Sequence, residues 1–335
     1  MNSRPEGTDF VVLTGFLGSG KTTLLRDFLT GPEAADTAVM VNEAGEIGLD
    51  GVILNEGNDT PIAMLSNGCI CCQAGSDLAY TIDRLLSVER PGATGPLRRL
   101  VLETSGLSKP GPVLRQLASL ASHRLRVSVL ATYDATRGME AAAFEEAAAQ
   151  WAAAHRIVVT KTDAVSPQTL ARVREEIASL NPLAEIVATA DRTSAVATAF
   201  APLSGVAPMP VPPEAETQAH ARIAVRLARP TSVLAYDDLA TWLDNLAGAL
   251  GERLLRLKGL VRVNESERPL LVQSVGTLFS PPRPFGEPQA SPPLFLVIIA
   301  RDLQPAELET VAPVGLFGFS SYGGLSSVQR FVRVD

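Results

Sequence analysis

The residues with the most distinctive chemistry are three cysteines within four positions, Cys69-Ile70-Cys71-Cys72. They are the only cysteines of the chain, so a disulfide framework would have no distant partners, and bonding neighbours strains the backbone. Thiolates at this spacing bind zinc and other thiophilic ions. The cluster therefore predicts a transition-metal site formed by Cys69, Cys71 and Cys72. Two alternatives stay open: a reducible bond between Cys69 and Cys71, or thiols that only fill a packed core.

A second motif, Gly15-Phe16-Leu17-Gly18-Ser19-Gly20-Lys21-Thr22, matches the phosphate-loop pattern at every fixed position, between a strand-like and a helix-like run. In such a loop, backbone N–H groups bind the β-phosphate, Lys21 reaches the β and γ oxygens, and the hydroxyl of Thr22 binds Mg²⁺. A glycine-rich turn that only reverses the chain is the alternative. The expected nucleotide-binding residues here are Gly15, Gly18, Ser19, Gly20, Lys21, Thr22 and Thr23.

An acidic residue at the end of a later apolar run suits the Mg²⁺ that accompanies a bound nucleotide. Glu103, in Leu102-Glu103-Thr104-Ser105-Gly106, can hold Mg²⁺ through water, and the N–H of Gly106 can face the γ-phosphate. We therefore predict Lys21, Thr22 and Glu103 as catalytic residues; an ordinary strand-end turn is the alternative. Because no Gln or His follows Glu103 at a useful spacing, slow hydrolysis is expected.

The segment Thr160-Lys161-Thr162-Asp163 predicts which base the bound nucleotide carries. Asp163 can accept hydrogen bonds from N1 and N2 of guanine, a donor pair that adenine lacks, and the stem of Lys161 would lie along the base. Thr160 begins this segment, and a backbone N–H of Val187–Ala190 could bind guanine O6. Together they predict GTP or GDP, with a strand-end turn as the alternative.

Composition excludes several other classes of protein. The chain has 335 residues, 46% of them hydrophobic and 19% charged, which suits a soluble globular protein with two domains. A net charge of −7 argues against broad nucleic-acid binding. No apolar run reaches transmembrane length and residues 1–9 carry no signal-peptide core, so we expect no membrane association. Unpaired thiols without an export signal predict a reducing cytoplasm.

Apolar runs alternate with helical segments over the first two hundred residues, which is typical of a parallel sheet with helices on both faces. We expect an α/β, doubly wound, mostly parallel domain at 1–200, a proline-rich linker at 201–218, and a smaller C-terminal α+β domain at 219–335. The first domain's strands are expected at 10–14, 38–41, 62–65, 100–102, 127–131, 156–159 and 186–188, and its helices at 21–29, 76–88, 113–120, 139–153 and 167–180. The second domain's strands are expected at 221–227, 259–263, 270–275, 294–299 and 329–334, its helices at 236–257 and 305–311, and a proline-rich loop at 280–293.

These motifs together resemble the CobW-type metallochaperone GTPases, a branch of the phosphate-loop GTPases linked to metal-cofactor assembly. The resemblance is carried by the phosphate loop with its trailing Thr23-Leu24-Leu25, by 42–50, by Gly68–Cys72 and by Glu103–Leu107. It runs over about residues 9–190, and Leu255-Arg256-Leu257-Lys258-Gly259 resembles the start of the family's C-terminal domain. The resemblance implies a P-loop GTPase domain, slow GTP hydrolysis, a metal at the cysteines, zinc or cobalt, and a client enzyme that receives it.

The sequence departs from the family pattern at three places. Thr160 replaces the usual Asn of the guanine motif, and Ala44 replaces a usual Phe in the segment expected to act as the first switch. The histidine-rich stretch of many members is absent, because His123, His155 and His220 are single and scattered. Metal storage on a histidine tail is therefore not expected.

A tetrahedral metal needs a fourth ligand beside three thiolates. Glu43 and Glu46 are the candidates because they lie on the segment expected to respond to the γ-phosphate; a solvated acidic loop is the alternative. Two other functions stay open: a non-catalytic, GTP-dependent metal sensor or scaffold, and a small-molecule kinase, against which the guanine motif argues. A homo-oligomer is a possible assembly.

Overall fold

The computed structural model describes residues 7–42, 62–64, 76–87, 96–118, 120, 123–203, 222–286, 292–311 and 315–322. The chain divides into two compact units, one of Met1–Ile177 with Ala184–Ala207, and one of Ala178–Leu183 with Pro208–Asp335. The domain and linker limits expected from the proline content stay a prediction, since most of the expected linker lies outside the described residues. None of the described helices is long and apolar enough to cross a bilayer.

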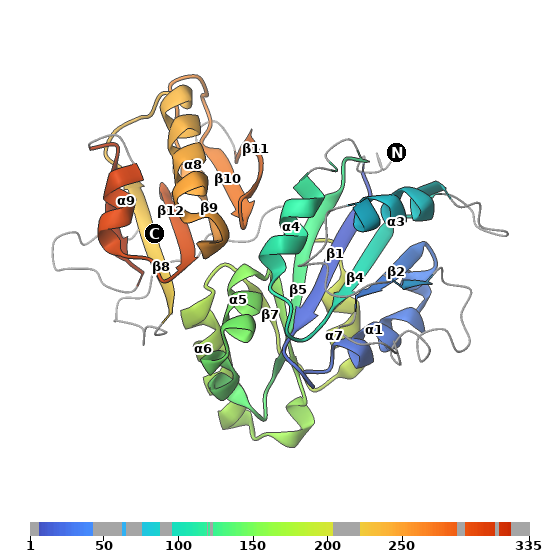
Figure 1. Ribbon diagram of the computed structural model, residues 1–335. Helices are drawn as coiled ribbons and strands as arrows, with labels where there is room; N and C mark the ends of the chain where they lie inside the picture. The colour runs from blue at the N-terminus through green and yellow to red at the C-terminus, as the bar shows by residue number, and fades with distance from the viewer. Residues whose placement is uncertain are drawn as a thin grey trace. The chain divides into compact units, whose positions relative to one another are not determined.

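The N-terminal unit is built on a seven-stranded parallel sheet in the order β3-β2-β4-β1-β5-β6-β7 (Figure 1). Its central strands read as continuous apolar runs because both of their faces are buried, as in β2, where all six residues are buried. This confirms the predicted α/β class. The strands are β1 (Asp9–Gly15), β2 (Thr37–Asn42), β3 (Ile62–Met64), β4 (Arg99–Thr104), β5 (Arg126–Asp134), β6 (Arg156–Thr160) and β7 (Glu185–Val187).

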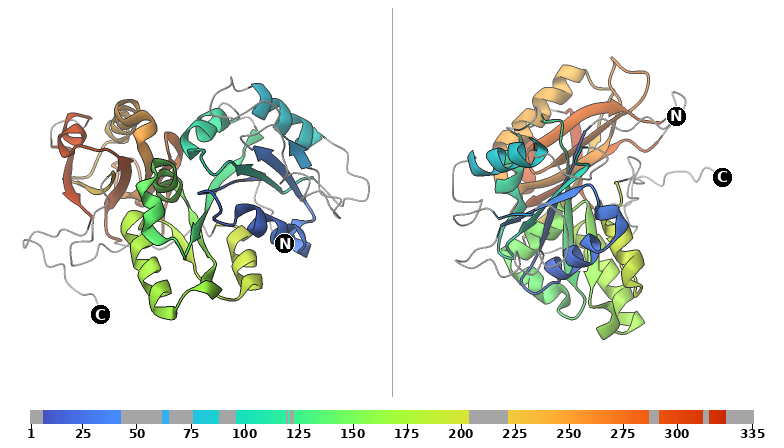
Figure 2. Two further views of the ribbon diagram at one scale, coloured as in Figure 1. Left: turned by 60° about the horizontal axis from the view of Figure 1, so that its bottom comes forward. Right: turned by 90° about the vertical axis from the view of Figure 1, so that its right-hand side faces the viewer.

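Helices cover both faces of this sheet (Figures 1 and 2). On one face α1 and α7 share a core with alternate strand residues, and Phe28 stacks on Phe200 with ring centroids 4.0 Å apart. On the other face Tyr133 contacts Trp151 of α5, and its hydroxyl donates to Glu176 of α6. The helices are α1 (Lys21–Leu29), α3 (Ser76–Ser87), α4 (Pro110–Ala118), α5 (Glu145–Ala153), α6 (Pro167–Leu180) and α7 (Arg192–Phe200), with 3₁₀ turns η1 (Pro32–Ala34), η3 (Gly138–Ala143) and η4 (Thr162–Ala164).

Two features of this unit differ from the sequence prediction. The helix expected at 139–153 is interrupted at Phe144, whose extended backbone separates η3 from α5 and whose ring stacks on Phe16. Helix α7 was not predicted because its small residues give little helical periodicity. Its start did carry a signal: Asp191 caps the helix by accepting a hydrogen bond from the N–H of Thr193.

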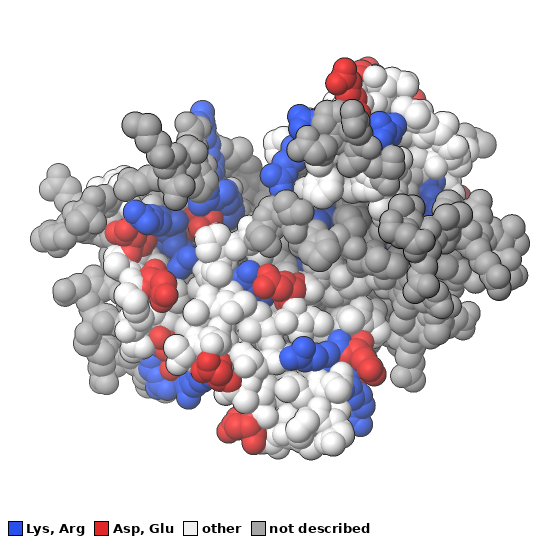
Figure 3. Space-filling view, turned by 180° about the vertical axis from the view of Figure 1, so that it is seen from behind, with Lys and Arg blue, Asp and Glu red and all other residues white. Residues whose placement is uncertain are grey.

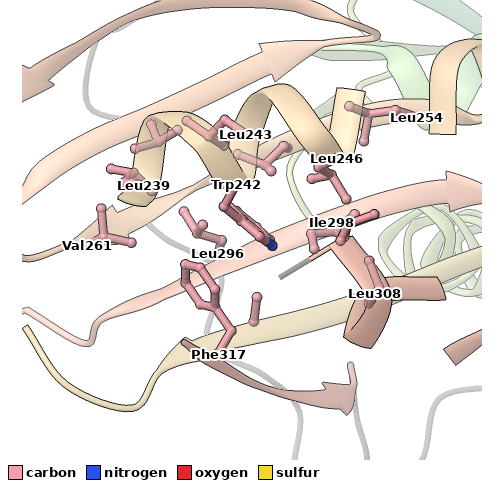
Figure 4. Packing of buried hydrophobic residues seen from close by; sticks show 14 of the residues in the cluster. Leu239, Trp242, Leu243, Leu246, Leu254, Val261, Leu296, Ile298, Leu308 and Phe317 are labelled. Atoms are coloured by element: carbon pink, nitrogen blue, oxygen red, sulfur yellow. The ribbon is translucent and has the colours of Figure 1, made fainter. Parts of the chain in front are cut away.

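The C-terminal unit is a six-stranded antiparallel sheet in the order β11-β10-β9-β12-β8-β13. Helices α8 (Tyr236–Leu250) and α9 (Pro305–Val311) pack on one face, where Trp242 lies 4.3 Å from Phe317 between ring centroids (Figure 4). This confirms the smaller α+β domain. The strands are β8 (Ile223–Pro230), β9 (Leu254–Val261), β10 (Leu270–Val275), β11 (Leu278–Pro284), β12 (Phe295–Arg301) and β13 (Phe317–Ser321).

Three predictions for this unit were wrong or lie outside the described residues. The helix expected at 236–257 ends at Leu250, because Gly251 takes a positive φ of 51° and a 3₁₀ turn η5 (Gly251–Arg253) leads directly into β9. The loop expected at 280–293 begins with β11, an edge strand, where prolines are tolerated because one side of the strand needs no N–H donors. Strand β13 was not predicted, and the strand expected at 329–334 lies outside the described part of the chain.

Candidate nucleotide site

The phosphate loop joins β1 to α1 and owes its shape to glycine. Gly15 has a φ of 145°, and a Cβ placed there would lie 2.0 Å from Thr132 Oγ1 and 2.8 Å from Ser19 Oγ. Gly18 and Gly20 also have positive φ, at 70° and 91°. Side chains are disfavoured at all three positions, at Gly15 for lack of space as well as by φ. The loop therefore presents its backbone at the N-terminus of α1, as an anion-binding loop requires.

The three predicted catalytic side chains gather at this helix start. The ammonium of Lys21 donates to the carbonyl oxygen of Gly15 at 2.9 Å and to that of Phe16 at 3.4 Å. The hydroxyl of Thr22 donates to Glu103 Oε1 at 2.7 Å, although Glu103 lies 81 residues further along the chain and is only 3% exposed. A hydroxyl and a buried carboxylate side by side form a donor set that suits Mg²⁺.

The turn after β4 packs against the phosphate loop. A Cβ on Gly106 would lie 2.7 Å from Leu17 Cδ2 and 2.8 Å from its backbone nitrogen, so only glycine fits there without displacing the loop. The fully buried amide of Gln150, on α5, donates to the carbonyl oxygens of Gly106 at 3.1 Å and Ser108 at 2.9 Å. Sequence reasoning missed Gln150, because its role depends on the packing of α5 rather than on a motif.

The segment predicted to bind the base is joined by hydrogen bonds to the phosphate loop and to the residues that follow β7. The hydroxyl of Thr160 donates to the carbonyl oxygen of Ser19 at 2.8 Å, so threonine makes a link to the loop from the position where Asn is usual. Lys161 takes a left-handed φ of 55°, and the hydroxyl of Thr162 donates to the carbonyl oxygen of Thr189 at 3.2 Å. Asp163 is exposed, which leaves its carboxylate open to a ligand.

A buried carboxylate that the sequence analysis did not select holds this segment in place. Asp134 ends β5, is 5% exposed, and accepts hydrogen bonds from Lys161 Nζ at 2.5 Å and from the N–H and hydroxyl of Thr136 at 2.9 and 2.6 Å. Burial opposes ionisation of Asp134, but the hydrogen bonds from Lys161 and Thr136 outweigh it, so the net pKa lies below its usual value. The sequence feature that could have identified Asp134 is an acidic residue at the end of an apolar strand.

Arg137, three residues further on, lies beside the phosphate loop. Its Nη1 donates to the carbonyl oxygen of Leu17 at 3.1 Å, and a Cβ on Gly18 would lie 3.9 Å from its Nη2. The side chain is 51% exposed. A guanidinium in this place adds positive charge next to the loop that is expected to hold the phosphates.

The predicted transition-metal residues Cys69, Cys71, Cys72, Glu43 and Glu46 all lie outside the described residues. Within the part of the chain that the structure describes, no three His, Cys, Asp or Glu side chains gather as a metal site would require. The cysteine site and its fourth ligand therefore stay predictions.

The sheet order, the glycine-shaped loop and the Thr22–Glu103 contact define a nucleotide-binding domain of the phosphate-loop class. The chain belongs to the CobW/HypB/UreG family: residues 9–188 match its nucleotide-binding domain, and residues 223–311 match the cobalamin synthesis protein cobW C-terminal domain. The predicted family is thus confirmed.

Named relatives align with most of the chain. The zinc chaperone YjiA of Escherichia coli is 30% identical over 291 residues, which cover 82% of this chain and 89% of that protein. The zinc chaperone CobW of Pseudomonas aeruginosa is 30% identical over 307 residues, with 80% of each protein covered. The crystal structure of Zn(II)-bound YjiA GTPase from E. coli matches with a TM-score of 0.65 and 22% identity, over 92% of this chain and 98% of that one, which supports the fold.

Proposed function

We propose that this protein is a GTP-hydrolysing metallochaperone that binds a transition metal at Cys69, Cys71 and Cys72 and delivers it to a client enzyme. The observation that supports nucleotide binding and hydrolysis is the contact between the hydroxyl of Thr22, at the start of α1, and the buried carboxylate of Glu103. The metal half rests on the cysteine cluster and on relatives that are named zinc chaperones.

In the proposed reaction, Mg²⁺ bound with GTP would neutralise charge that develops on the phosphates. Thr22 and Glu103 would hold that ion, directly and through water, and Lys21 would bind the β and γ oxygens. Gly106 would offer its N–H to the γ-phosphate. Thr160, Lys161 and Asp163 would select guanine, with Asp134 fixing the ammonium of Lys161.

The metal is the cargo of the proposed cycle, and zinc or cobalt suits a thiolate-rich site. Glu43 or Glu46 would supply the fourth ligand. Both lie on the segment expected to respond to the γ-phosphate, so a metal bound by one of them and by the cysteines would connect the two segments. GTP would then order the metal site and hydrolysis would loosen it.

The proposed partner is the client enzyme, and the expectations of a cytoplasmic location, of no nucleic-acid partner and of a possible homo-oligomer stay predictions. On the face shown in Figure 3, the basic and acidic side chains of the described residues are intermingled, and these residues form no uniform basic surface there.

Competitive zinc titration against a chromophoric chelator tests the proposal, with GDP or a non-hydrolysable GTP analogue present. Tighter zinc binding with the analogue than with GDP is expected for the wild type. Cys71→Ser should weaken zinc binding in both states, whereas Lys21→Ala should keep the metal site but remove the difference between nucleotides. Equal zinc affinity in the two nucleotide states would contradict the coupling.

Steady-state GTP hydrolysis separates this function from the alternative of a non-catalytic sensor or scaffold. Slow turnover that rises when zinc or a client is added supports the metallochaperone. Nucleotide binding without any turnover would favour the sensor.

A further inference from the structure

Helix α5 buries one polar side chain beside small apolar ones. Its seven buried residues are five alanines, Trp151 and Gln150, and Gln150 is fully buried. The amide nitrogen of Gln150 donates to the carbonyl oxygens of Gly106 at 3.1 Å and Ser108 at 2.9 Å. Its Oε1 is buried without a hydrogen-bond partner among the residues that the structure describes. An unsatisfied buried acceptor lowers stability, so what the amide holds explains its presence better than packing does.

The turn that Gln150 holds lies between β4 and α4. It is closed by a hydrogen bond from the N–H of Ser108 to the carbonyl oxygen of Ser105 at 3.0 Å. Gly106 is buried, and its N–H makes no hydrogen bond within the described part of the chain. This N–H is the group proposed above to bind the γ-phosphate. Because the carbonyl oxygens of Gly106 and Ser108 are both held, the turn cannot rotate these peptide groups without breaking a hydrogen bond to Gln150.

Two further contacts connect the start of α5 to the nucleotide site. Phe144, directly before α5, stacks on Phe16 of the phosphate loop with ring centroids 4.7 Å apart. Glu145, the first residue of α5, accepts a hydrogen bond from the ammonium of Lys109 at 2.5 Å, one residue after the turn. The same helix therefore contacts the phosphate loop and the turn, and it fixes the position of one relative to the other.

We propose that Gln150 is a positioning residue for the γ-phosphate. By holding the turn at 105–108, its amide keeps the N–H of Gly106 in place for the γ-phosphate and so sets how strongly the protein prefers GTP to GDP. A turn that is already held loses less conformational freedom when the ligand binds. GDP has no γ-phosphate, so its affinity should not depend on Gln150. This role rests on the proposed GTPase function and adds to it a residue that lies outside the nucleotide-binding loops.

Fluorescence titration of the full-length chain with GDP and with a non-hydrolysable GTP analogue, each with Mg²⁺, tests this role. Gln150→Met keeps a side chain of similar length and removes the donors. We expect its affinity for the analogue to fall by about fivefold or more and its affinity for GDP to change by less than about twofold, with kcat for GTP hydrolysis falling as well. Gln168→Met, the same replacement at an exposed position of α6, is the matched control and should leave both affinities and kcat unchanged.

Gln150→Glu provides a second test and decides if Gln150→Met does not fold. An ionised carboxylate cannot donate to the two carbonyl oxygens, whereas a protonated carboxyl group donates one hydrogen bond. Lowering the pH from about 8 to about 6 should therefore restore part of the preference for the analogue over GDP, relative to the wild type at the same pH, because burial favours the protonated form.

The two proposals fail in different ways. The role of Gln150 is overturned if Gln150→Met keeps the wild-type ratio of affinities and kcat, or if it loses affinity for both nucleotides equally, as a role in packing alone would predict. For Gln150→Glu, a ratio that does not recover relative to the wild type as the pH falls has the same meaning. A wild type that binds both nucleotides but does not hydrolyse GTP contradicts the proposed function, while the ratio of affinities still decides the role of Gln150.

Discussion

Lys258→Met should stabilise the unliganded protein at neutral pH. Burial, together with repulsion from Arg256 and Arg283, lowers the pKa of Lys258 from 10.5 to about 8. At about 1.4 kcal/mol per pKa unit, this shift corresponds to a cost of about 3 kcal/mol when the lysine is charged in the folded state. Methionine has a similar length and no charge, so we expect the free energy of unfolding of the C-terminal unit at pH 7 to rise by about 1 to 3 kcal/mol.

The gain should depend on pH with a definite sign. Below about pH 8 the lysine is protonated in both the folded and unfolded states, so the full penalty applies. Between about pH 8 and 10.5 the unfolded chain binds more protons than the folded chain, so the wild type becomes more stable as the pH rises. The difference between variant and wild type should therefore shrink over this range.

Urea unfolding at pH 7 and at pH 9.5 measures this difference. Trp242 is fully buried in the C-terminal unit and reports on it alone once Trp151, the other tryptophan, is replaced by phenylalanine in all samples. Arg268→Met serves as the exposed control and should change the free energy of unfolding little at either pH. A Lys258→Met variant that is less stable than the wild type at pH 7, or a difference that does not change with pH, would refute the reasoning.

Two further predictions concern the nucleotide site. Glu103→Gln keeps an acceptor for the hydroxyl of Thr22 but removes the buried charge. The rate of GTP hydrolysis, measured by phosphate release, should therefore fall by about tenfold or more, while GDP binding without Mg²⁺ is retained. An unchanged rate would show that Glu103 does not take part in the magnesium site. Asp134→Asn leaves the ammonium of Lys161 without the charged partner that Asp134 provides, so the affinity for GDP, measured by fluorescence titration, should fall by about tenfold. A variant that binds GDP as tightly as the wild type would show that other contacts position Lys161.

Local sequence patterns were sufficient to predict an element of the fold where the contacts that determine it join residues close in sequence. The phosphate loop needs glycine at positions fixed by its own backbone angles, and helices α1, α6 and α9 begin and end where their turn residues and periodicity predict. Helix α8 was predicted too long, because Leu254, Leu255 and Leu257 continue its apolar character, whereas pairing with β10 and β12 makes this segment a strand. The proline-rich β11 was missed because its pairing at a sheet edge is a property of the fold.

The sequence by itself determined the family, the α/β class and the residue types of the nucleotide site, because these depend on short motifs whose spacing is visible along the chain. Only the tertiary structure decided that Glu103 meets Thr22, that Gln150 and Asp134 support the loops around the phosphate loop, and that Arg256 and Lys258 are buried. The physical reason is that burial and contact between residues distant in sequence are set by how strands pair and helices pack, and these interactions appear only when the chain is folded.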